Sequence, residues 1–225
     1  MHRWLLCLCL IATPLLSSDL SALSDKDVGK GLKEALVQGV GTAVGQLSLA
    51  DGFLGNPDVK IPLPPSLERA EKVLRDIGMG SYADELVTTM NRAAEAAVVE
   101  AKPILLEGIK KMTLADAKAI LTGPEDSATQ YFRKTSGEAI IQKFMPKVKA
   151  ATGRVKLAED YNRFAGPAAQ FGLIDQQDAD LDQYITRKAV AGLFLMIAQQ
   201  EKAIRVDPVG QTSKLLRKVF GSLLK

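Results

Sequence analysis

Two groups of charged and polar residues at helical spacing are the strongest candidates for chemistry in this sequence. Asn91, Arg92 and Glu95 fall within about one turn of a predicted helix that is otherwise rich in alanine. Glu201 and Arg205 stand four residues apart, in the acid-first order that favours an ion pair on a helix. Structural ion networks gather charges as readily as binding sites do. We therefore interpret both groups first as networks that tie helices together, and keep ligand binding as the alternative.

Asp116, Thr129 and Tyr131 complete the candidate network or binding residues. Asp116 suits the start of a short helix, where an acid interacts favourably with the helix dipole. Tyr131 is expected in the core with its hydroxyl hydrogen-bonded. A carboxylate acts as a general acid or base near neutral pH only where burial disfavours its charged form. For Glu95 the neighbouring Arg92 opposes that effect, so no residue is assigned a catalytic role.

The lack of histidine and cysteine after the first 24 residues limits the reactions and metal sites that are possible. The single histidine and the two cysteines are His2, Cys7 and Cys9, so residues 25–225 contain neither type. That segment therefore has no thiol nucleophile, no Ser-His-Asp triad and no imidazole or thiolate metal ligand. It also has no disulfide, so a hydrophobic core must stabilise the fold. We expect no metal and no cofactor.

Two short motifs resemble ligand-binding loops but lack residues that those loops need. The three aspartates within 178–182 resemble the start of a calcium loop without its glycine and final acid, and are interpreted as acids at a helix start. The glycine-rich segment 39–45 lacks the third glycine of a dinucleotide fingerprint and follows no predicted strand. We expect Gly41 and Gly45, one turn apart, to let a neighbouring helix approach closely.

The first 24 residues have the pattern of a cleavable secretory signal peptide. A basic start precedes a mostly apolar run at 4–16, which is shorter than the roughly 20 residues that a membrane span needs. Ala22 and Ser24 are small residues three and one positions before a cut, so we expect cleavage after Ser24, with a cut after Ala22 as the alternative. Because both cysteines lie inside the apolar run, the leader is not that of a lipoprotein. We expect a periplasmic protein.

Apolar residues recur at helical spacing nearly throughout residues 25–225, and alternating strand patterns are scarce, 59–61 being the best. This predicts a single all-α domain of about nine helices, with a long buried central helix. Thr135–Glu138 has the spacing of a capping box that starts a helix at 139, and Pro146 is expected to kink or split that helix. The predicted helices cover 25–49, 66–78, 81–101, 103–112, 113–123, 139–151, 153–165, 178–205 and 211–224. Pro124 also suits a first helical turn, followed by the acids Glu125 and Asp126.

Charge and hydropathy indicate whether nucleic acid or a membrane is an expected partner. A net charge of +3 without basic runs among aromatics does not favour nucleic acid. No apolar run in 25–225 is long enough for a transmembrane span. The last predicted helix can dock on its own domain or make peripheral membrane contact through residues 211–225, and we favour docking. Its apolar face consists of Leu216, Val219, Phe220 and Leu223.

Several segments in combination resemble the bacterial family known as domain of unknown function 4197. The segments are 31–36 (Gly-Leu-Lys-Glu-Ala-Leu), 60–64, 90–97, 112–123, 128–132 and 201–208, together with the ending around Gly221. The resemblance covers nearly all of residues 25–225. It implies an exported helical bacterial protein and implies no reaction.

The sequence thus favours a binding or interaction module of the cell envelope, with an apolar groove or pocket for a lipid-like ligand. The all-apolar stretch of the predicted central helix and the basic amphipathic end of the chain motivate this hypothesis. The first alternative is a structural or partner-binding periplasmic protein without a small ligand. The second is a carboxylate-based enzyme that uses Glu95 or Asp116. The expected partner is a lipid-like ligand or an envelope protein.

Overall fold

The computed structural model describes residues 25–172 and 175–206, and every regular element within them is helical. The helices are α1 (Asp25–Leu47), α2 (Glu68–Asp76), α3 (Gly80–Val98), α4 (Ala101–Lys111), α5 (Leu114–Thr122), α6 (Ser127–Thr152), α7 (Lys156–Gln170) and α8 (Leu181–Val206). The short 3-10 helices η2 (Pro65–Leu67) and η3 (Gln176–Asp178) precede α2 and α8. The predicted all-α fold is confirmed, although about nine helices is slightly more than the described residues contain. The predicted leader 1–24 and the helix predicted at 211–224 lie outside these residues.

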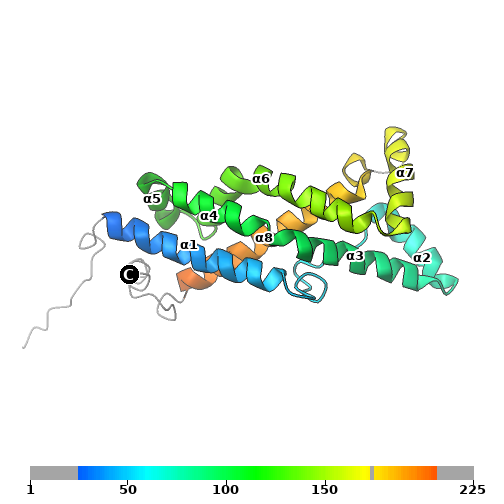
Figure 1. Cartoon of the computed structure of the whole chain (residues 1–225), viewed down its shortest axis with the longest axis horizontal. Helices are drawn as coiled ribbons and strands as arrows, with labels where there is room; N and C mark the ends of the chain where they lie inside the picture. Colours follow the sequence, from blue (N-terminus) through cyan, green and yellow to red (C-terminus); the bar gives the residue numbers. More distant parts are fainter. Residues whose placement is uncertain (1–24, 173–174, 207–225) are drawn as a thin grey trace, which may run out of the picture.

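The helices form an elongated bundle whose two ends consist of different elements (Figure 1). α5 and the start of α1 lie at one end, while α2 and α7 lie at the other. α3 and α4 follow one another along the bundle with a short break at Val99 and Glu100. The loop 48–64 packs on α8 beyond the end of α1, since Phe53 and Val59 lie next to Gly192. A loop therefore completes the cover of α8.

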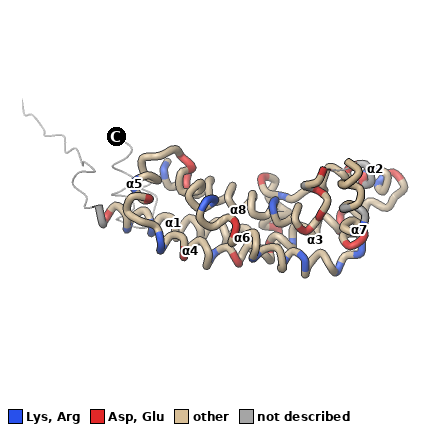
Figure 2. Tube along the Cα trace, turned by 90° about the horizontal axis from the view of Figure 1, so that it is seen from above, with Lys and Arg blue, Asp and Glu red and all other residues tan. Residues whose placement is uncertain are grey.

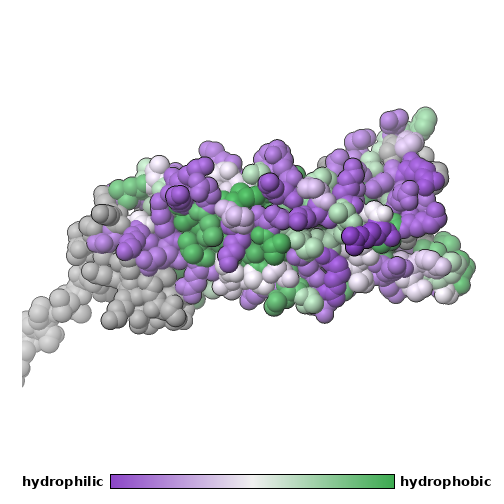
Figure 3. Space-filling view, in the orientation of Figure 1, coloured by the Kyte–Doolittle hydropathy of each residue, from purple (hydrophilic) through white to green (hydrophobic). Residues whose placement is uncertain are grey.

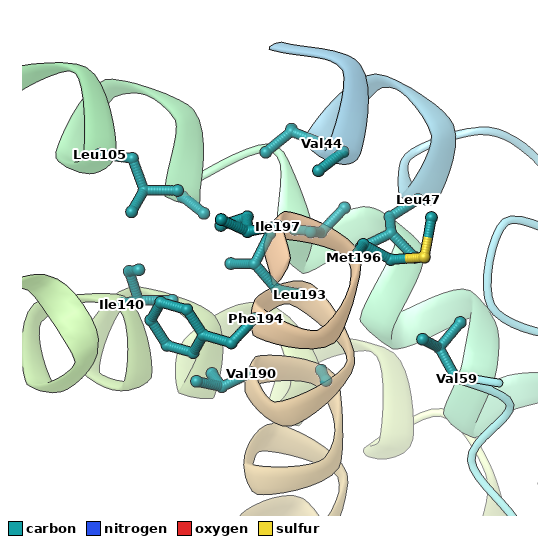
Figure 4. Close-up of a cluster of buried hydrophobic side chains, with 14 of the residues drawn as sticks. Val44, Leu47, Val59, Leu105, Ile140, Val190, Leu193, Phe194, Met196 and Ile197 are labelled. Carbon is teal, nitrogen blue, oxygen red and sulfur yellow. The ribbon is translucent and has the colours of Figure 1, made fainter. Parts of the chain in front are cut away.

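α8 is the centre of the core, because side chains on most sides of it are buried. A Cβ on Gly192 would lie only 2.9 Å from the Phe53 ring, so glycine is needed where the loop approaches. On another side, Phe194 packs against Gly137 of α6. Figure 4 shows side chains of α8 meeting those of several neighbouring helices. Leu195, 40% exposed, is an exception. The predicted buried central helix is confirmed.

The helix start predicted at Thr135–Glu138 is wrong. α6 begins at Ser127 and continues through Pro146 to Thr152, so the proline does not split it. Ser136 and the glycine after it are buried in the middle of the helix. A Cβ on Gly108 would lie 3.1 Å from the Ser136 Oγ, which shows that α4 and α6 approach closely here. The small residues in this motif serve helix packing rather than capping.

The close helix approach predicted at Gly41 and Gly45 is also wrong. Among the described residues, no atom of a neighbouring element lies within 4 Å of the positions that their Cβ atoms would take. Gly39 makes the close contact instead, since a Cβ there would lie 3.5 Å from Gln200 and Ile204 of α8. At helical spacing, Gly41 and Gly45 point away from the buried stripe of α1.

Charged side chains of both signs are distributed along the whole bundle (Figure 2). In the part of the chain that the structure describes, no helix combines the length and hydropathy needed to cross a membrane.

Candidate functional site

Glu95 is a buried carboxylate that fixes the loop after α1. Its Oε1 accepts hydrogen bonds from the backbone N–H groups of Phe53 and Leu54, at 3.1 and 3.3 Å. Its Oε2 accepts a 2.7 Å hydrogen bond from Arg92 Nη1. The residues beside it on α3 are mostly buried alanines, whose small side chains let the loop backbone reach the carboxylate. Both carboxylate oxygens are therefore engaged.

Arg92 extends this contact to the surface. Its Nη2 donates to Asp51 Oδ1 at 2.7 Å, and 41% of its side chain is exposed. The pKa of Arg92 is raised above its ordinary value, mainly by its hydrogen bond to Glu95 and then by that to Asp51. Asp51 has a φ of 66°, a left-handed conformation that aspartate adopts more readily than most residues. The three charged groups thus hold the turn that opens the loop.

Asn91, one turn before Glu95, holds the far part of the same loop. Its Oδ1 accepts a 2.8 Å hydrogen bond from the Ile61 N–H, and its Nδ2 donates to the Ile61 carbonyl at 2.9 Å. The Nδ2 also donates to the Val87 carbonyl at 2.8 Å. The amide pairs with Ile61 as a residue of a neighbouring strand does. This contact gives hydrogen-bond partners to both backbone groups of Ile61. The extended segment 59–61, to which Ile61 belongs, forms no strand.

Glu201 of α8 caps the start of α6. Its Oε1 accepts a 3.0 Å hydrogen bond from the Ala128 N–H, and its Oε2 accepts from the N–H and the hydroxyl of Thr129, each at 2.9 Å. The first N–H groups of a helix have no partner within it, and a negative charge there complements the helix dipole. Asp126, which precedes α6, makes no side-chain capping hydrogen bond. Glu201 therefore supplies the cap from a distant part of the chain.

Arg205 joins the same contact to the end of α5. Its Nη2 donates to Glu201 Oε1 and to the Ile120 carbonyl, each at 2.8 Å. Only 17% of the Arg205 side chain and 5% of the Glu201 side chain are exposed. A carboxylate thus lies at a helix start and a guanidinium at a helix end, the arrangement that helix dipoles favour. One ion pair on α8 holds the junction of α5 and α6.

Asp116 and Tyr131 lie outside both networks. Asp116 forms a capping box with Thr113, accepting from its backbone N–H at 2.9 Å and from its hydroxyl at 2.7 Å. The hydrogen bond from the Thr113 hydroxyl is the main cause that lowers the pKa of Asp116, so this acid is charged at neutral pH. The Tyr131 hydroxyl donates to the Gly108 carbonyl at 3.4 Å, and burial raises its pKa.

Asp182 is a third buried carboxylate, and the sequence does not reveal its contacts. It accepts a hydrogen bond from the Thr152 hydroxyl at the end of α6, and Asn162 Nδ2 of α7 lies 3.4 Å away. Asp180, in contrast, caps α8, because its Oδ1 accepts from the backbone N–H three residues later at 3.0 Å. Within 25–172 and 175–206, no group of three or more acidic, histidine or cysteine residues is placed to hold a metal ion.

An apolar groove lies between α1 and the segment that joins α4 to α5. We call it the α1–α5 groove; it has a volume of about 800 Å³ and is open to solvent. Val37 and Leu114, at 45% and 42% exposed, are large apolar residues in its wall. The residues that line it include Gly29, Lys30, Lys33, Val37, Met112 and Leu114.

The sequence favours an apolar groove or pocket, but none of the residues that line the α1–α5 groove is among the candidates that it predicts. Gly29 and Val37 are two turns apart on the edge of the buried stripe of α1, and a single exposed apolar residue there is ordinary. A Cβ on Gly29 would lie 3.4 Å from Leu114, so the glycine lets the start of α5 approach. Lys33 Nζ donates to the Lys110 carbonyl at 3.1 Å and so ties α1 to the end of α4. The groove depends on contacts between distant segments.

The fold and these contacts define an all-helical bundle in which buried carboxylates hold a loop and helix ends, beside an open apolar groove. The chain belongs to the family described as a protein of unknown function (DUF4197), whose family model matches residues 22–221. This match confirms the family resemblance seen in the sequence. No curated protein and no solved structure matches the chain.

Proposed function

We propose that this protein is a binding module of the cell envelope and that its α1–α5 groove holds a lipid-like ligand. The observation that carries the proposal is an apolar groove of about 800 Å³ with large exposed apolar side chains in its wall. Ligand sites are concave, mostly apolar and roughly 300–1,000 Å³ in volume. A groove of this size and lining suits an acyl chain better than a polar metabolite.

Charges at the rim favour a ligand with an anionic headgroup. Lys30, Lys33 and one acid, Glu34, lie on the wall formed by α1, and Lys110 and Lys111 end α4 nearby, so bases outnumber acids at the rim. Among the described residues, no ion-pair partner of Lys30 is found. Lysine side chains bury their aliphatic stems on apolar surface while the ammonium stays in water. The rim therefore suits a carboxylate or phosphate headgroup above an apolar tail.

A titration with two variants tests this proposal. Palmitate and a phosphatidylglycerol are titrated separately, which distinguishes a free fatty acid from a membrane lipid, and native mass spectrometry counts bound molecules. Val37→Glu is expected to weaken binding roughly tenfold or more, because it places a charge in the apolar wall beside an anionic ligand. Val99→Glu is the matched control, since Val99 is 48% exposed but lies between α3 and α4. Equal affinities for both variants would contradict the proposal.

Envelope location rests on the N-terminal pattern, so it is tested separately. We propose cleavage after Ser24, which leaves residues 25–225 as one periplasmic domain without a lipid anchor. Intact mass spectrometry of the protein from the periplasmic fraction should give a chain that starts at Asp25. A product that retains Cys7 or carries an added acyl mass would contradict this.

A partner protein is the second candidate ligand, and a different surface favours it. The end of α2, the start of α3 and their connection expose several large apolar side chains at the end of the molecule opposite α5, visible as apolar surface in Figure 3. They are Val73, Ile77, Met79 and Tyr82, with exposed fractions of 58%, 62%, 41% and 53%. Exposed apolar patches mark interaction sites. Loss of an envelope cross-link on Ile77→Glu, with lipid binding unchanged, would favour this candidate.

The carboxylate-enzyme hypothesis has the least support. Both oxygens of Glu95 accept hydrogen bonds from a guanidinium and two backbone N–H groups, so this carboxylate is already engaged in holding the loop. Asp116 is held charged by Thr113. Because its pKa is lowered, Asp116 is a poor proton donor near neutral pH.

A further inference from the structure

The corner between α2 and α3 is an exposed apolar surface at the end of the bundle opposite α5 (Figure 1). Its large apolar side chains, which we call the α2–α3 patch, are those of Val73, Ile77, Met79 and Tyr82. Arg75 holds the corner together, because its Nη2 donates to Glu71 of α2 at 2.7 Å and to Asp84 of α3 at 2.6 Å. Gly78, with a φ of 78°, permits the tight turn between the two helices. The patch is therefore presented in a fixed shape.

The charges around the α2–α3 patch are mostly negative. Between 71 and 85 the acids are Glu71, Asp76, Asp84 and Glu85, and the bases are Lys72 and Arg75. Arg75 already pairs with two of these acids. The other two, Asp76 and Glu85, are exposed and have no ion-pair partner in the part of the chain that the structure describes. The patch therefore suits a partner surface that is apolar and carries positive charge.

The α1–α5 groove has matching features near the other end of the bundle. Its wall is apolar, and bases outnumber acids at its rim. Within 25–172 and 175–206, neither Lys30 nor Lys110 forms an ion pair. The wall from Gly29 to Val37 extends about 12 Å along α1, whereas the patch residues of α2 lie one turn, about 6 Å, apart. The corner of α2 is therefore short enough to enter the groove.

We propose that the α2–α3 patch of one molecule docks in the α1–α5 groove of a second copy, with the acids beside the patch facing the lysines at the rim. The two surfaces lie towards opposite ends of an elongated bundle, so each molecule uses a different surface for each neighbour. Such a head-to-tail contact repeats from copy to copy and builds a ring or an open filament. Because the patch is small, association is weak and depends on concentration. It does not require the ligand proposed above.

Mixing two variants tests this arrangement by analytical ultracentrifugation. The average mass of the unaltered protein should at least double between roughly 10 μM and 1 mM, the range of a weak complex. Ile77→Glu removes the patch and Val37→Glu removes the groove, so each variant alone should stay monomeric. An equimolar mixture should form dimers and nothing larger. The groove of the Ile77→Glu chain accepts the patch of the Val37→Glu chain, and no second intact pair remains.

Controls make the outcomes decisive. Ile77 and Val37 are 62% and 45% exposed, so both variants should fold, which circular dichroism verifies. Val99→Glu, at a position 48% exposed between α3 and α4, should associate as the unaltered protein does. An unaltered protein that is monomeric at 1 mM, a patch or groove variant that still associates alone, or a mixture of the two that stays monomeric would overturn the proposal.

Palmitate separates this proposal from the proposed function. If palmitate binds to the Ile77→Glu chain, whose groove is free, it should also dissociate assemblies of the unaltered protein, because both compete for one groove. Palmitate that binds to that variant but leaves the assemblies intact would overturn docking in the groove. If palmitate and phosphatidylglycerol both fail to bind even to the Ile77→Glu chain, the proposed function fails, and the mixing experiment still decides the assembly.

Discussion

The buried carboxylates Glu95 and Glu201 have the same chemistry but hold different parts of the molecule. Each accepts hydrogen bonds from two backbone N–H groups and pairs with an arginine on its own helix. Glu95 fixes a loop, and its Arg92 reaches solvent and a second acid, Asp51. Glu201 fixes a helix start, and its Arg205 is enclosed and binds a helix end.

The difference shows that the surroundings of the arginine decide how much such a contact contributes. When a carboxylate is removed, an exposed arginine keeps water and any other acid that it contacts. An enclosed arginine is left without a charge partner, and the backbone groups that the acid bonded are also unsatisfied. We therefore expect the junction of α5 and α6 to be more sensitive to substitution than the loop.

Glu201→Ala should give the largest loss of stability. It leaves Arg205 without a charge partner and two N–H groups of α6 without an acceptor in a buried place, so the free energy of unfolding should fall by roughly 3–5 kcal/mol. Urea unfolding followed by circular dichroism measures this. Glu201→Gln is the control, because it keeps an acceptor for the helix start and should lose less. A loss from Glu201→Ala below about 1 kcal/mol, the size of an exposed ion pair, would contradict the role as a cap.

Glu95→Ala should be destabilising to a smaller extent, by roughly 2–3 kcal/mol, because two backbone N–H groups lose their acceptor while Arg92 keeps Asp51. Amide hydrogen exchange should accelerate at Phe53 and Leu54 and remain slow in α6. A loss as large as that of Glu201→Ala would contradict the expected difference between the two carboxylates. A fully stable Glu95→Ala protein that no longer binds ligand would instead mark this network as a binding site.

Substituting the two arginines tests the same comparison from the basic partner of each ion pair. Arg205→Met should lower the urea midpoint clearly, because Glu201 loses its counter-charge inside the fold and the Ile120 carbonyl loses a donor. Arg92→Met should change the midpoint much less, since its side chain is 41% exposed. Methionine keeps the aliphatic packing in both cases. Equal shifts for the two variants would show that exposure does not govern these contacts.

Local patterns in the sequence predict the helices well but not the contacts between them. Apolar periodicity predicts α1 and the buried middle of α8, because one face of each helix must be covered. The same local reasoning fails at Thr135–Glu138, where the capping pattern lies inside α6. The real start of α6 is stabilised by Glu201, 73 residues away from Ala128 in the sequence. No local rule contains that information.

The candidate residues illustrate the same limit. Spacing predicts that Glu201 can pair with Arg205, because residues four apart are neighbours on a helix. It does not predict that Asn91 binds Ile61 or that Asp182 accepts from Thr152. These contacts depend on the position of the loop against α3 and of the end of α6 against α8. The α1–α5 groove escapes prediction for the same reason. Its walls come from separate helices whose relative placement only the fold determines.

Asp116 extends the comparison to a carboxylate that caps a helix at the surface, where the smallest effect is expected. Its lowered pKa means that the folded state favours the charged form. The stabilisation is therefore present above the ordinary pKa of aspartate, about 3.9, and is lost as pH falls through the lowered folded value. Thr113→Val removes the main cause, so an NMR titration should show the pKa of Asp116 rising towards 3.9. The stability difference between Thr113→Val and the unaltered chain should shrink as pH falls from 5 to 2, because protonation removes the charge that the hydroxyl stabilises. A difference that is constant across this range would assign the effect of Thr113 to its backbone geometry instead of its contact with Asp116.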